Sequence, residues 1–359
     1  MNILIILNEE RNEKITEVKY GLLLEHARCW VANDNEVYLF GIKVPDKWKD
    51  AGFHFVKSPG RIPSNIRAYF WFLSEAHPRV DLVIQSVGVL NFLYKKTATV
   101  LYWPDSHPIK RHLRIYYKVK EKLIKFICSS FFKKSFYLVS DWQQVEMLLG
   151  VHVDRDKIYL IKKGLPYELK KKKLRNKIFG KRLLFASKSL SFEGINLALE
   201  IFKNIDRRNE GWIFTMIIRN NLLGKIKTLF QKLQMQSKVN FWVYESPKTL
   251  IRELIRSDIF LDTLINKDSI YNDIIAMNLK NIVIAHEAQI LEEYRGFDKV
   301  AKIALSRDPI QIAKITMDQV GEIEENEKHL KDGLFFSLQY FWDQLAEDSI
   351  NFLGKIRPE

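Results

Sequence analysis

Short apolar runs alternate along the chain with longer stretches in which apolar residues recur at helical spacing. The first run, at residues 3–7, predicts a buried strand, and residues 15–32 predict the helix that follows it. Strands that are apolar at every position are typical of parallel sheets with helices on both faces. The first half of the chain is therefore predicted to be a parallel α/β domain. Its further strands are predicted at residues 37–40, 82–84, 99–103, 137–139 and 158–161.

Three further helices are predicted in this half, at residues 64–76, 109–134 and 141–149. Ser140 directly precedes the third of them. A serine hydroxyl can accept a hydrogen bond from a free N–H group in the first helical turn. Ser140 is therefore predicted to be the N-cap of that helix.

The same alternation starts again at residue 182. A polar stretch with four consecutive lysines, residues 170–173, precedes it and is predicted to link the two halves. The chain is therefore expected to fold as two α/β halves joined near residue 175. The first helix of the second half is predicted at residues 195–204. Its strands are predicted at residues 182–186, 212–218, 239–243, 259–261 and 282–284.

The composition is that of a globular chain. The 359 residues are 47% hydrophobic and 28% charged, which excludes disordered, collagen-like and disulfide-dense classes, and the length suits two domains. There are 57 lysines and arginines against 43 aspartates and glutamates, so the formal net charge is +14. This excess favours anionic partners, namely phosphate groups, nucleic acid or an acidic membrane surface.

The cysteines and histidines argue against a metal centre. Cys29 and Cys128 lie far apart, and the eight histidines show no paired spacing. Two isolated cysteines also suit a reducing compartment. The N-terminus lacks the features of a secretory signal, and no apolar window of about 18 residues could span a bilayer. We therefore expect a cytoplasmic protein.

The predicted helix at residues 109–134 is strongly basic, with nine lysines and arginines against Glu121 alone. Leu113, Tyr117 and Ile124 recur at helical spacing, so the helix would be amphipathic. Such a helix suits docking on anionic lipid. Alternatively, its apolar stripe faces the protein core and the lysines are simply solvated. The candidate membrane-facing residues are Lys110, Arg111, Arg114, Lys118, Lys122 and Lys125.

Several short motifs follow one another in a fixed order along both halves. A strand, a serine, a helix and the segment KIYLIKKG occupy residues 137–164. The loop LLFASKSLSFEG occupies residues 183–194, and Ala276 and Met277 precede the strand Ile-Val-Ile-Ala. In order and spacing these motifs resemble those of the family 4 retaining glycosyltransferases with the GT-B fold. Lys163 stands where that family usually has asparagine.

The resemblance implies the GT-B architecture, in which two Rossmann-like domains face each other across a cleft. On this basis we expect an acceptor-side domain at residues 1–168, a linker at 169–180 and a nucleotide-sugar domain at 181–335. The segment FWDQLA resembles the family's C-terminal helix that crosses back over the hinge. Residues 336–359 are therefore expected to return to the N-terminal domain.

The resemblance also implies donor-binding residues in the second half. Ser187 and Lys188 lie in the loop after its first strand, where Lys188 takes the place of the motif arginine and would neutralise a donor diphosphate. Arg219 ends a strand from which it could reach a phosphate. Tyr271 and Asn272 are expected to line the donor loop.

Other positions depart from the family pattern. Its paired glutamates, which contact the sugar hydroxyls and the ribose, fall on Lys267 and Ile275. Asp268 and Asp273 lie nearby, and a small shift of register could bring one of them into the motif. The motif lysine of the donor loop falls on Glu193, whose carboxylate would repel a diphosphate.

On the acceptor side, the family's His-Asp pair corresponds roughly to WPDSH at residues 103–107. Asp105 and His107 are therefore the candidate catalytic residues, expected to contact the acceptor or the sugar. The alternative interpretation is a capped turn, because proline and aspartate are turn formers.

The resemblance implies a hexosyl-type glycosyltransferase. It would move a sugar from a nucleotide-sugar donor to a cell-envelope glycan or a lipid-linked acceptor, such as lipopolysaccharide or capsule. The nucleotide sugar is a substrate, no cofactor is implied, and an enzyme of this kind would lie at the inner face of the cell membrane. The missing carboxylates leave open a non-catalytic GT-B partner subunit or glycan-binding module. Nucleic-acid binding rests on the net charge alone and is not expected.

Overall fold

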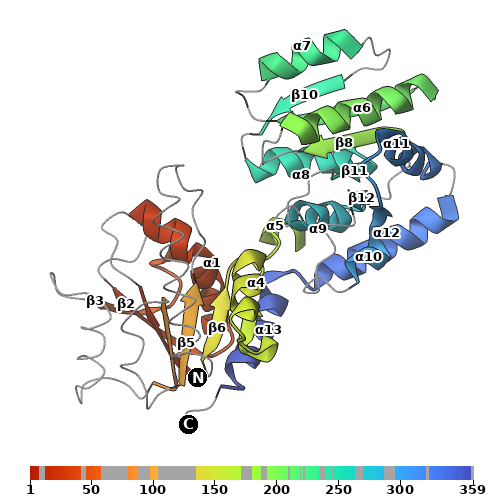
Figure 1. The fold of residues 1–359 in the computed structure, drawn as a ribbon. Coiled ribbons are helices and arrows are strands. Elements are labelled where there is room, and N and C mark those ends of the chain that lie inside the picture. The colour runs from red at the N-terminus through yellow and green to blue at the C-terminus, as the bar shows by residue number, and fades with distance from the viewer. Residues whose placement is uncertain are drawn as a thin grey trace. The chain divides into compact units, whose positions relative to one another are not determined.

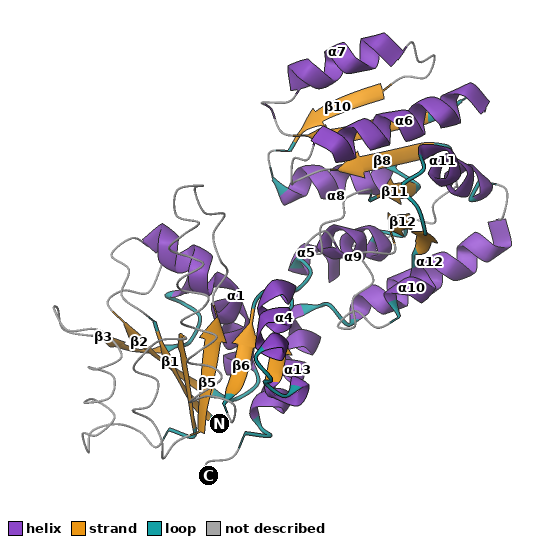
Figure 2. Ribbon diagram, in the orientation of Figure 1, coloured by secondary structure: helices purple, strands orange, loops and turns teal. Residues whose placement is uncertain are grey.

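A computed structural model gives the fold of the chain (Figure 1), with its helices and strands distinguished in Figure 2. The chain forms two compact units: unit 1 is Met1–Gly164 with Trp342–Glu359, and unit 2 is Leu165–Phe341. The structure describes residues 1–7, 13–41, 46–57, 80–86, 98–103, 135–170, 180–186, 192–208, 211–218, 220, 223–233, 239–244, 246–262, 270–286, 296–320 and 323–356.

Unit 1 contains a seven-stranded parallel sheet in the order β3-β2-β1-β4-β5-β6-β7. The strand order runs outward in both directions from the neighbouring strands β1 and β4. This is the doubly wound arrangement expected from helix-length connections between parallel strands. The strands are β1 (Asn2–Ile6), β2 (Glu36–Gly41), β3 (His54–Lys57), β4 (Leu82–Ser86), β5 (Ala98–Trp103), β6 (Phe136–Val139) and β7 (Ile158–Leu160). The helices described in this unit are α1 (Glu13–Ala32), α4 (Trp142–Gly150) and α13 (Trp342–Leu353), with short 3₁₀ turns η1 (Asp46–Trp48) and η4 (Arg155–Lys157).

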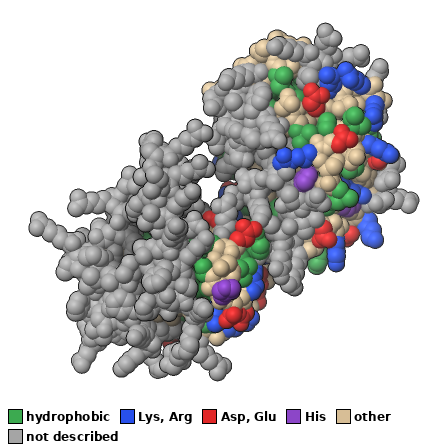
Figure 3. All heavy atoms as spheres, viewed as in Figure 1, with side chains coloured by type: hydrophobic (Ala, Val, Ile, Leu, Met, Phe, Trp, Pro, Cys, Tyr) green, Lys and Arg blue, Asp and Glu red, His purple; other side chains and the backbone are tan. Residues whose placement is uncertain are grey.

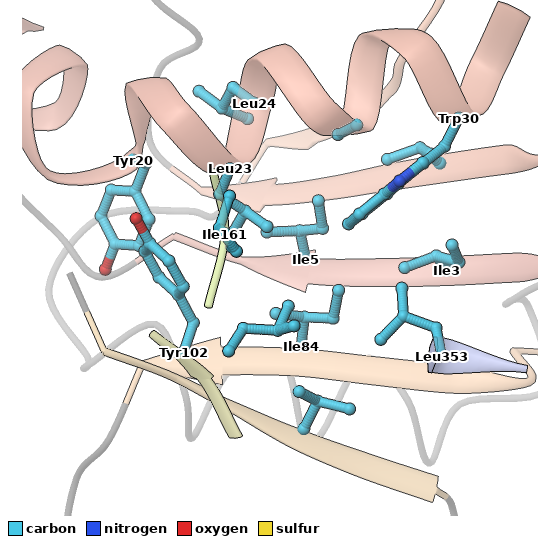
Figure 4. Close-up of a cluster of buried hydrophobic side chains, with 14 of the residues drawn as sticks. Ile3, Ile5, Tyr20, Leu23, Leu24, Trp30, Ile84, Tyr102, Ile161 and Leu353 are labelled. Atoms are coloured by element: carbon cyan, nitrogen blue, oxygen red, sulfur yellow. The ribbon is translucent and has the colours of Figure 1, made fainter. Parts of the chain in front are cut away.

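The packing of strand β1 explains why its sequence is apolar at every position. Ile3 and Ile5 lie beneath α1 in one buried cluster, which also contains Trp30 (Figure 4). Leu4 and Ile6 belong to a second buried cluster, because successive side chains of a strand point to opposite faces. Both faces of the strand are therefore covered, as the apolar run predicted.

Helix α4 begins one residue later than its predicted cap implied. Its N-cap is Asp141, whose carboxylate accepts a hydrogen bond of 2.9 Å from the backbone N–H of Gln144. Ser140 instead donates its own backbone N–H to the side-chain oxygen of Gln144, at 2.9 Å. The prediction of Ser140 as the N-cap is therefore wrong, because the neighbouring carboxylate satisfies the free N–H group.

Helix α13, at the end of the chain, packs against α1 in unit 1. The hydroxyl of Ser349 lies 3.2 Å from Nδ1 of the buried His26, and the Nε2–H of His26 donates to the backbone oxygen of Lys162 at 2.9 Å. The ring of Trp342 packs so closely on Gly164 that a Cβ atom at this position would collide with it. Side chains of α1 and α13 thus converge on the segment at which the chain leaves unit 1.

Unit 2 contains a six-stranded parallel sheet in the order β10-β9-β8-β11-β12-β13, which reverses between β8 and β11. The strands are β8 (Arg182–Ala186), β9 (Ile213–Ile218), β10 (Val239–Val243), β11 (Ile259–Leu261), β12 (Ile282–His286) and β13 (Lys302–Ala304). The helices are α5 (Tyr167–Lys170), α6 (Phe192–Arg208), α7 (Leu223–Leu233), α8 (Pro247–Arg256), α9 (Ile270–Asn278), α10 (Phe297–Val300), α11 (Pro309–Asp318) and α12 (Ile323–Leu338). Helix α6 packs beside α11, and α9 packs beside α12.

The strands predicted from the apolar runs are all present, with ends shifted by at most two residues. Strands β3 and β13 were not predicted. The helices predicted at residues 64–76 and 109–134 lie outside the described residues. None of the helices that the structure describes is long and apolar enough to cross a membrane. On the face drawn in Figure 3, the described basic side chains are interspersed with acidic and apolar ones.

Candidate functional site

The candidate site lies at the carboxyl ends of the strands in unit 2, where the strand order reverses between β8 and β11. In doubly wound sheets, the connections leave this point in opposite directions and open a crevice in which ligands bind. Asp262 directly follows β11, and its backbone N–H donates to the carbonyl of Ile284 in β12 at 2.9 Å. This bond fixes the start of the β11–α9 connection, and the Asp262 side chain is buried there.

Asp273, in the first turn of α9, lies against Asp262. It is completely buried, and its carboxyl group is within hydrogen-bonding reach of the Asp262 carboxyl group. Burial raises the pKa of Asp273 well above its ordinary value, and the charge and hydrogen bond of Asp262 raise it further. The protonated form of Asp273 is therefore favoured, and its O–H group can donate a hydrogen bond to the Asp262 carboxylate.

Two tyrosines lie at the same end of the sheet. Tyr244 follows β10, and its backbone N–H donates to the carbonyl of Ile218, the last residue of β9, at 2.8 Å. Tyr271 lies in the first turn of α9; burial is the main cause that raises its pKa, and Tyr244 and Glu168 add to the effect. Burial also raises the pKa of Tyr244. Both phenols therefore keep their protons at neutral pH and can donate hydrogen bonds.

This set of groups suits a neutral, hydroxyl-rich ligand. A carboxylate accepts hydrogen bonds from hydroxyl groups, and phenols both donate and accept them. These side chains carry no positive charge, so the neutralisation of a phosphate has to come from other residues. Among the described residues, no group of three or more His, Cys, Asp or Glu side chains is arranged to hold a metal ion.

Two of the sequence-predicted donor residues are described. Tyr271 lies in the first turn of α9, where the Tyr244 side chain contributes to raising its pKa, and Asn272 follows it and is partly buried. Ile275, at the position of one family glutamate, is an apolar core residue of α9. The family carboxylate therefore has no counterpart at that position. Asp273 lies two residues earlier in the same helix and is completely buried.

The other predicted site residues lie outside the described part of the chain. Three belong to the donor side, two are the catalytic candidates, and six form the basic membrane-facing set. They are Ser187, Lys188, Arg219, Asp105, His107, Lys110, Arg111, Arg114, Lys118, Lys122 and Lys125.

Sequence reasoning missed Asp262 and Tyr244. Each directly follows an apolar strand, and residues after parallel strands meet at the carboxyl edge of the sheet, where ligands bind. The sequence signal that could have identified Asp262 is its position directly after the apolar run Ile259–Leu261. What the sequence did not contain was the contact with Asp273, which depends on how α9 packs.

Comparison with known proteins supports the fold. No family model and no curated protein matches the chain in sequence. Among solved structures, a glycosyltransferase from Rickettsia africae is similar over 99% of this chain and 98% of its own, with TM-score 0.68 and 14% identity. HepE from Anabaena, crystallised with UDP and glucose, is similar over 99% and 100% of the two chains, with TM-score 0.60 and 10% identity.

A third similar structure is WaaG, a glycosyltransferase involved in lipopolysaccharide biosynthesis. It is similar over 97% of this chain and 98% of its own, with TM-score 0.55 and 12% identity. At such identities the likeness defines the fold. The chain has the α/β fold of the GT-B glycosyltransferases, with two parallel sheets flanked by helices, as the motifs implied.

Proposed function

We propose that the protein is a glycosyltransferase that moves a sugar from a nucleotide-sugar donor to a cell-envelope glycan or lipid-linked acceptor. The observation that carries the proposal is the group of polar side chains at the carboxyl end of the unit 2 sheet, within a fold matched over 99% of the chain by a glycosyltransferase; these side chains are Asp262, Asp273, Tyr244 and Tyr271. HepE, with the same fold, has been crystallised with UDP and with UDP-glucose. This supports a nucleotide sugar as the donor.

The donor would bind at the carboxyl ends of β8, β9 and β11. Ser187 and Lys188 follow β8 in the sequence, and Arg219 follows β9. In our proposal, Lys188 and Arg219 offset the negative charge that develops on the diphosphate as it leaves, a form of catalysis that needs positive groups held in place. Tyr271, Asn272 and Asp262 would contact the hydroxyl groups of the donor.

The acceptor side would lie in unit 1. Asp105 and His107 follow β5 in the sequence, and we propose that one of them contacts the acceptor or the transferred sugar. The basic segment at residues 109–134 would hold the enzyme on anionic lipid at the inner face of the membrane. The lipopolysaccharide role of WaaG supports an envelope acceptor.

The test is sugar transfer or donor hydrolysis by the purified chain with a panel of nucleotide sugars. We expect turnover with at least one donor and its loss, by roughly a hundredfold or more, in Lys188→Ala, because a preorganised positive group at the leaving diphosphate is removed. The matched control is Lys181→Ala, at the amino end of the same strand β8, which should leave turnover unchanged. Absence of both turnover and nucleotide binding would contradict the proposal.

A second candidate function is a non-catalytic GT-B subunit or glycan-binding module. The observation that favours it is the buried Ile275 at the place of a family glutamate, with Lys267 at the place of the other. The same panel separates the two functions. A module would show no turnover with any donor and would co-purify with an active glycosyltransferase.

A further inference from the structure

The buried carboxyl pair of Asp262 and Asp273 carries an inference that rests on the proposed function and goes beyond it. Among the described residues, no hydrogen-bond donor reaches either carboxylate oxygen of Asp273. The residue is fully buried, and its helix neighbours Ile270, Ile274 and Met277 are buried and apolar. An ionised Asp273 would thus be a buried charge without a partner, which proteins avoid.

A proton on Asp273 removes this difficulty. A protonated carboxyl group has one O–H donor, and the Asp262 carboxyl group is the acceptor within its reach. One proton then serves both side chains, as it does generally where two carboxyl groups share a site. The charge is left on Asp262, the member of the pair that lies directly at the carboxyl end of β11.

The position of this charge matters for a ligand. β11 neighbours β8 at the reversal point of the sheet, the place at which doubly wound sheets bind their ligands. A single carboxylate held there in a fixed orientation accepts two hydrogen bonds from a pair of adjacent hydroxyl groups. Both the ribose and the sugar of a nucleotide sugar present such pairs.

We propose that Asp262 is a donor-binding residue that accepts hydrogen bonds from adjacent hydroxyl groups of the nucleotide sugar, and that Asp273 is its positioning residue. Asp273 holds the Asp262 carboxylate through the proton that they share. The chain has Lys267 and Ile275 at the positions of the family's glutamates. In our proposal, the Asp262–Asp273 pair binds the donor hydroxyl groups in place of those glutamates.

The test compares ligand binding by the wild type and four variants, measured by calorimetry. The six probes are UDP, GDP and ADP, each alone and each conjugated to one hexose, either glucose or mannose. Asp262→Asn should weaken binding of the preferred ligand roughly ten- to a hundredfold, the range of a hydrogen bond to a charged group. Asp273→Leu should weaken it similarly. Asp273→Asn should bind within about twofold of the wild type, because its N–H donates to Asp262 as the protonated carboxyl group does.

The matched control is Asp258→Asn. Asp258 is also a buried aspartate, but it stands at the amino end of the same strand β11. It should leave binding unchanged. A loss confined to the sugar conjugates assigns the hydroxyl groups to the transferred sugar, whereas a loss that includes the free diphosphate assigns them to the ribose; both support the proposal.

Infrared spectroscopy tests the shared proton without any ligand. The wild type should show the carbonyl band of a protonated carboxyl group at pH 7, and Asp273→Asn should lack it while Asp258→Asn keeps it. Equal affinity in Asp262→Asn, or equal losses in Asp273→Asn and Asp273→Leu, would overturn the inference. If the wild type binds none of the six probes, the proposed function itself fails.

Discussion

The imidazole of His26 is enclosed by α1, α13 and the segment that precedes Gly164. It bonds to the Lys162 carbonyl and to the Ser349 hydroxyl, and the ring of Trp342 packs edge-on against it at 5.6 Å between centroids. Burial lowers the pKa of His26 to about 4, although the hydrogen bond to Lys162 and the charge of Glu25 act in the opposite direction. The docking of α13 on unit 1 therefore depends on a neutral histidine.

We expect unit 1 to lose stability as pH falls. The pKa of His26 is lower in the folded chain than the value of about 6.5 in an unfolded one, so the folded state favours the neutral form. The full stabilisation is present above pH 6.5 and is lost as pH falls from there to about 4. The loss is about 3 kcal/mol, since one pKa unit corresponds to ~1.36 kcal/mol.

Urea unfolding of wild type, His26→Gln and His54→Gln between pH 7 and pH 4 measures this loss. His26→Gln should lack the contribution, because glutamine does not titrate. His54 is exposed, so His54→Gln should keep the wild-type dependence. The same pH dependence in His26→Gln as in the wild type would assign the loss to other groups.

The residues of the candidate site differ in whether a short stretch of sequence is enough to identify them. Tyr271 and Asn272 were found through a motif, which is a local pattern that the sequence carries. Asp262 and Asp273 are eleven positions apart, and only the packing of α9 against the sheet at β12 brings their carboxyl groups together. The sequence did suggest Asp273 as a carboxylate near the motif, but it contained no sign of a shared proton.

At the scale of elements, a strand could be predicted where its sequence has an apolar run. The inner strands are covered on both faces, and their apolar runs made them recognisable. The two strands that were missed, β3 and β13, each stand at one end of a described strand order; β7 and β10 stand at the other ends, but their apolar runs made them predictable. β3 begins with His54 and ends with Lys57, and β13 has only three residues. A strand with one exposed edge does not require a continuous apolar run, so a short or partly polar one such as β3 or β13 resembles a loop in sequence.

The basic segment at residues 109–134 yields a prediction about membranes. Flotation with vesicles should recover the chain with anionic phosphatidylglycerol and not with neutral phosphatidylcholine, and salt should weaken the binding. Each basic residue near such a surface contributes roughly 1 kcal/mol, so replacing six of them by glutamine should abolish flotation. The six are Lys110, Arg111, Arg114, Lys118, Lys122 and Lys125.

The control replaces six exposed lysines of unit 2 and removes the same charge. They are Lys227, Lys248, Lys299, Lys314, Lys328 and Lys331. This variant should still float if the segment is the docking element. Equal loss in both variants would indicate attraction by net charge alone, and an apolar stripe that packs inward would give no flotation at all.

At the scale of the whole chain, two Rossmann-type sheets are joined by two neighbouring connections. The backbone N–H of Leu165 donates to the carbonyl of Tyr340 at 2.7 Å, so the outgoing and returning segments pair where they enter and leave unit 2. The doubly wound order of each sheet follows from parallel strands and right-handed connections. The apolar runs predicted parallel α/β halves, and the Rossmann-like domains were implied by the family resemblance. The donor site is proposed on unit 2, at the reversal point of its sheet.

Hydrogen–deuterium exchange with and without nucleotide sugar locates that site. With the preferred donor of the panel bound, peptides that cover residues 184–191 and 262–274 should exchange more slowly, because they contain the carboxyl ends of β8 and β11 and the start of α9. Peptides around residues 180–182 and 256–258, at the amino ends of the same strands, should be unchanged. Slower exchange only at the amino ends, or nowhere in unit 2, would contradict a donor site at the reversal point.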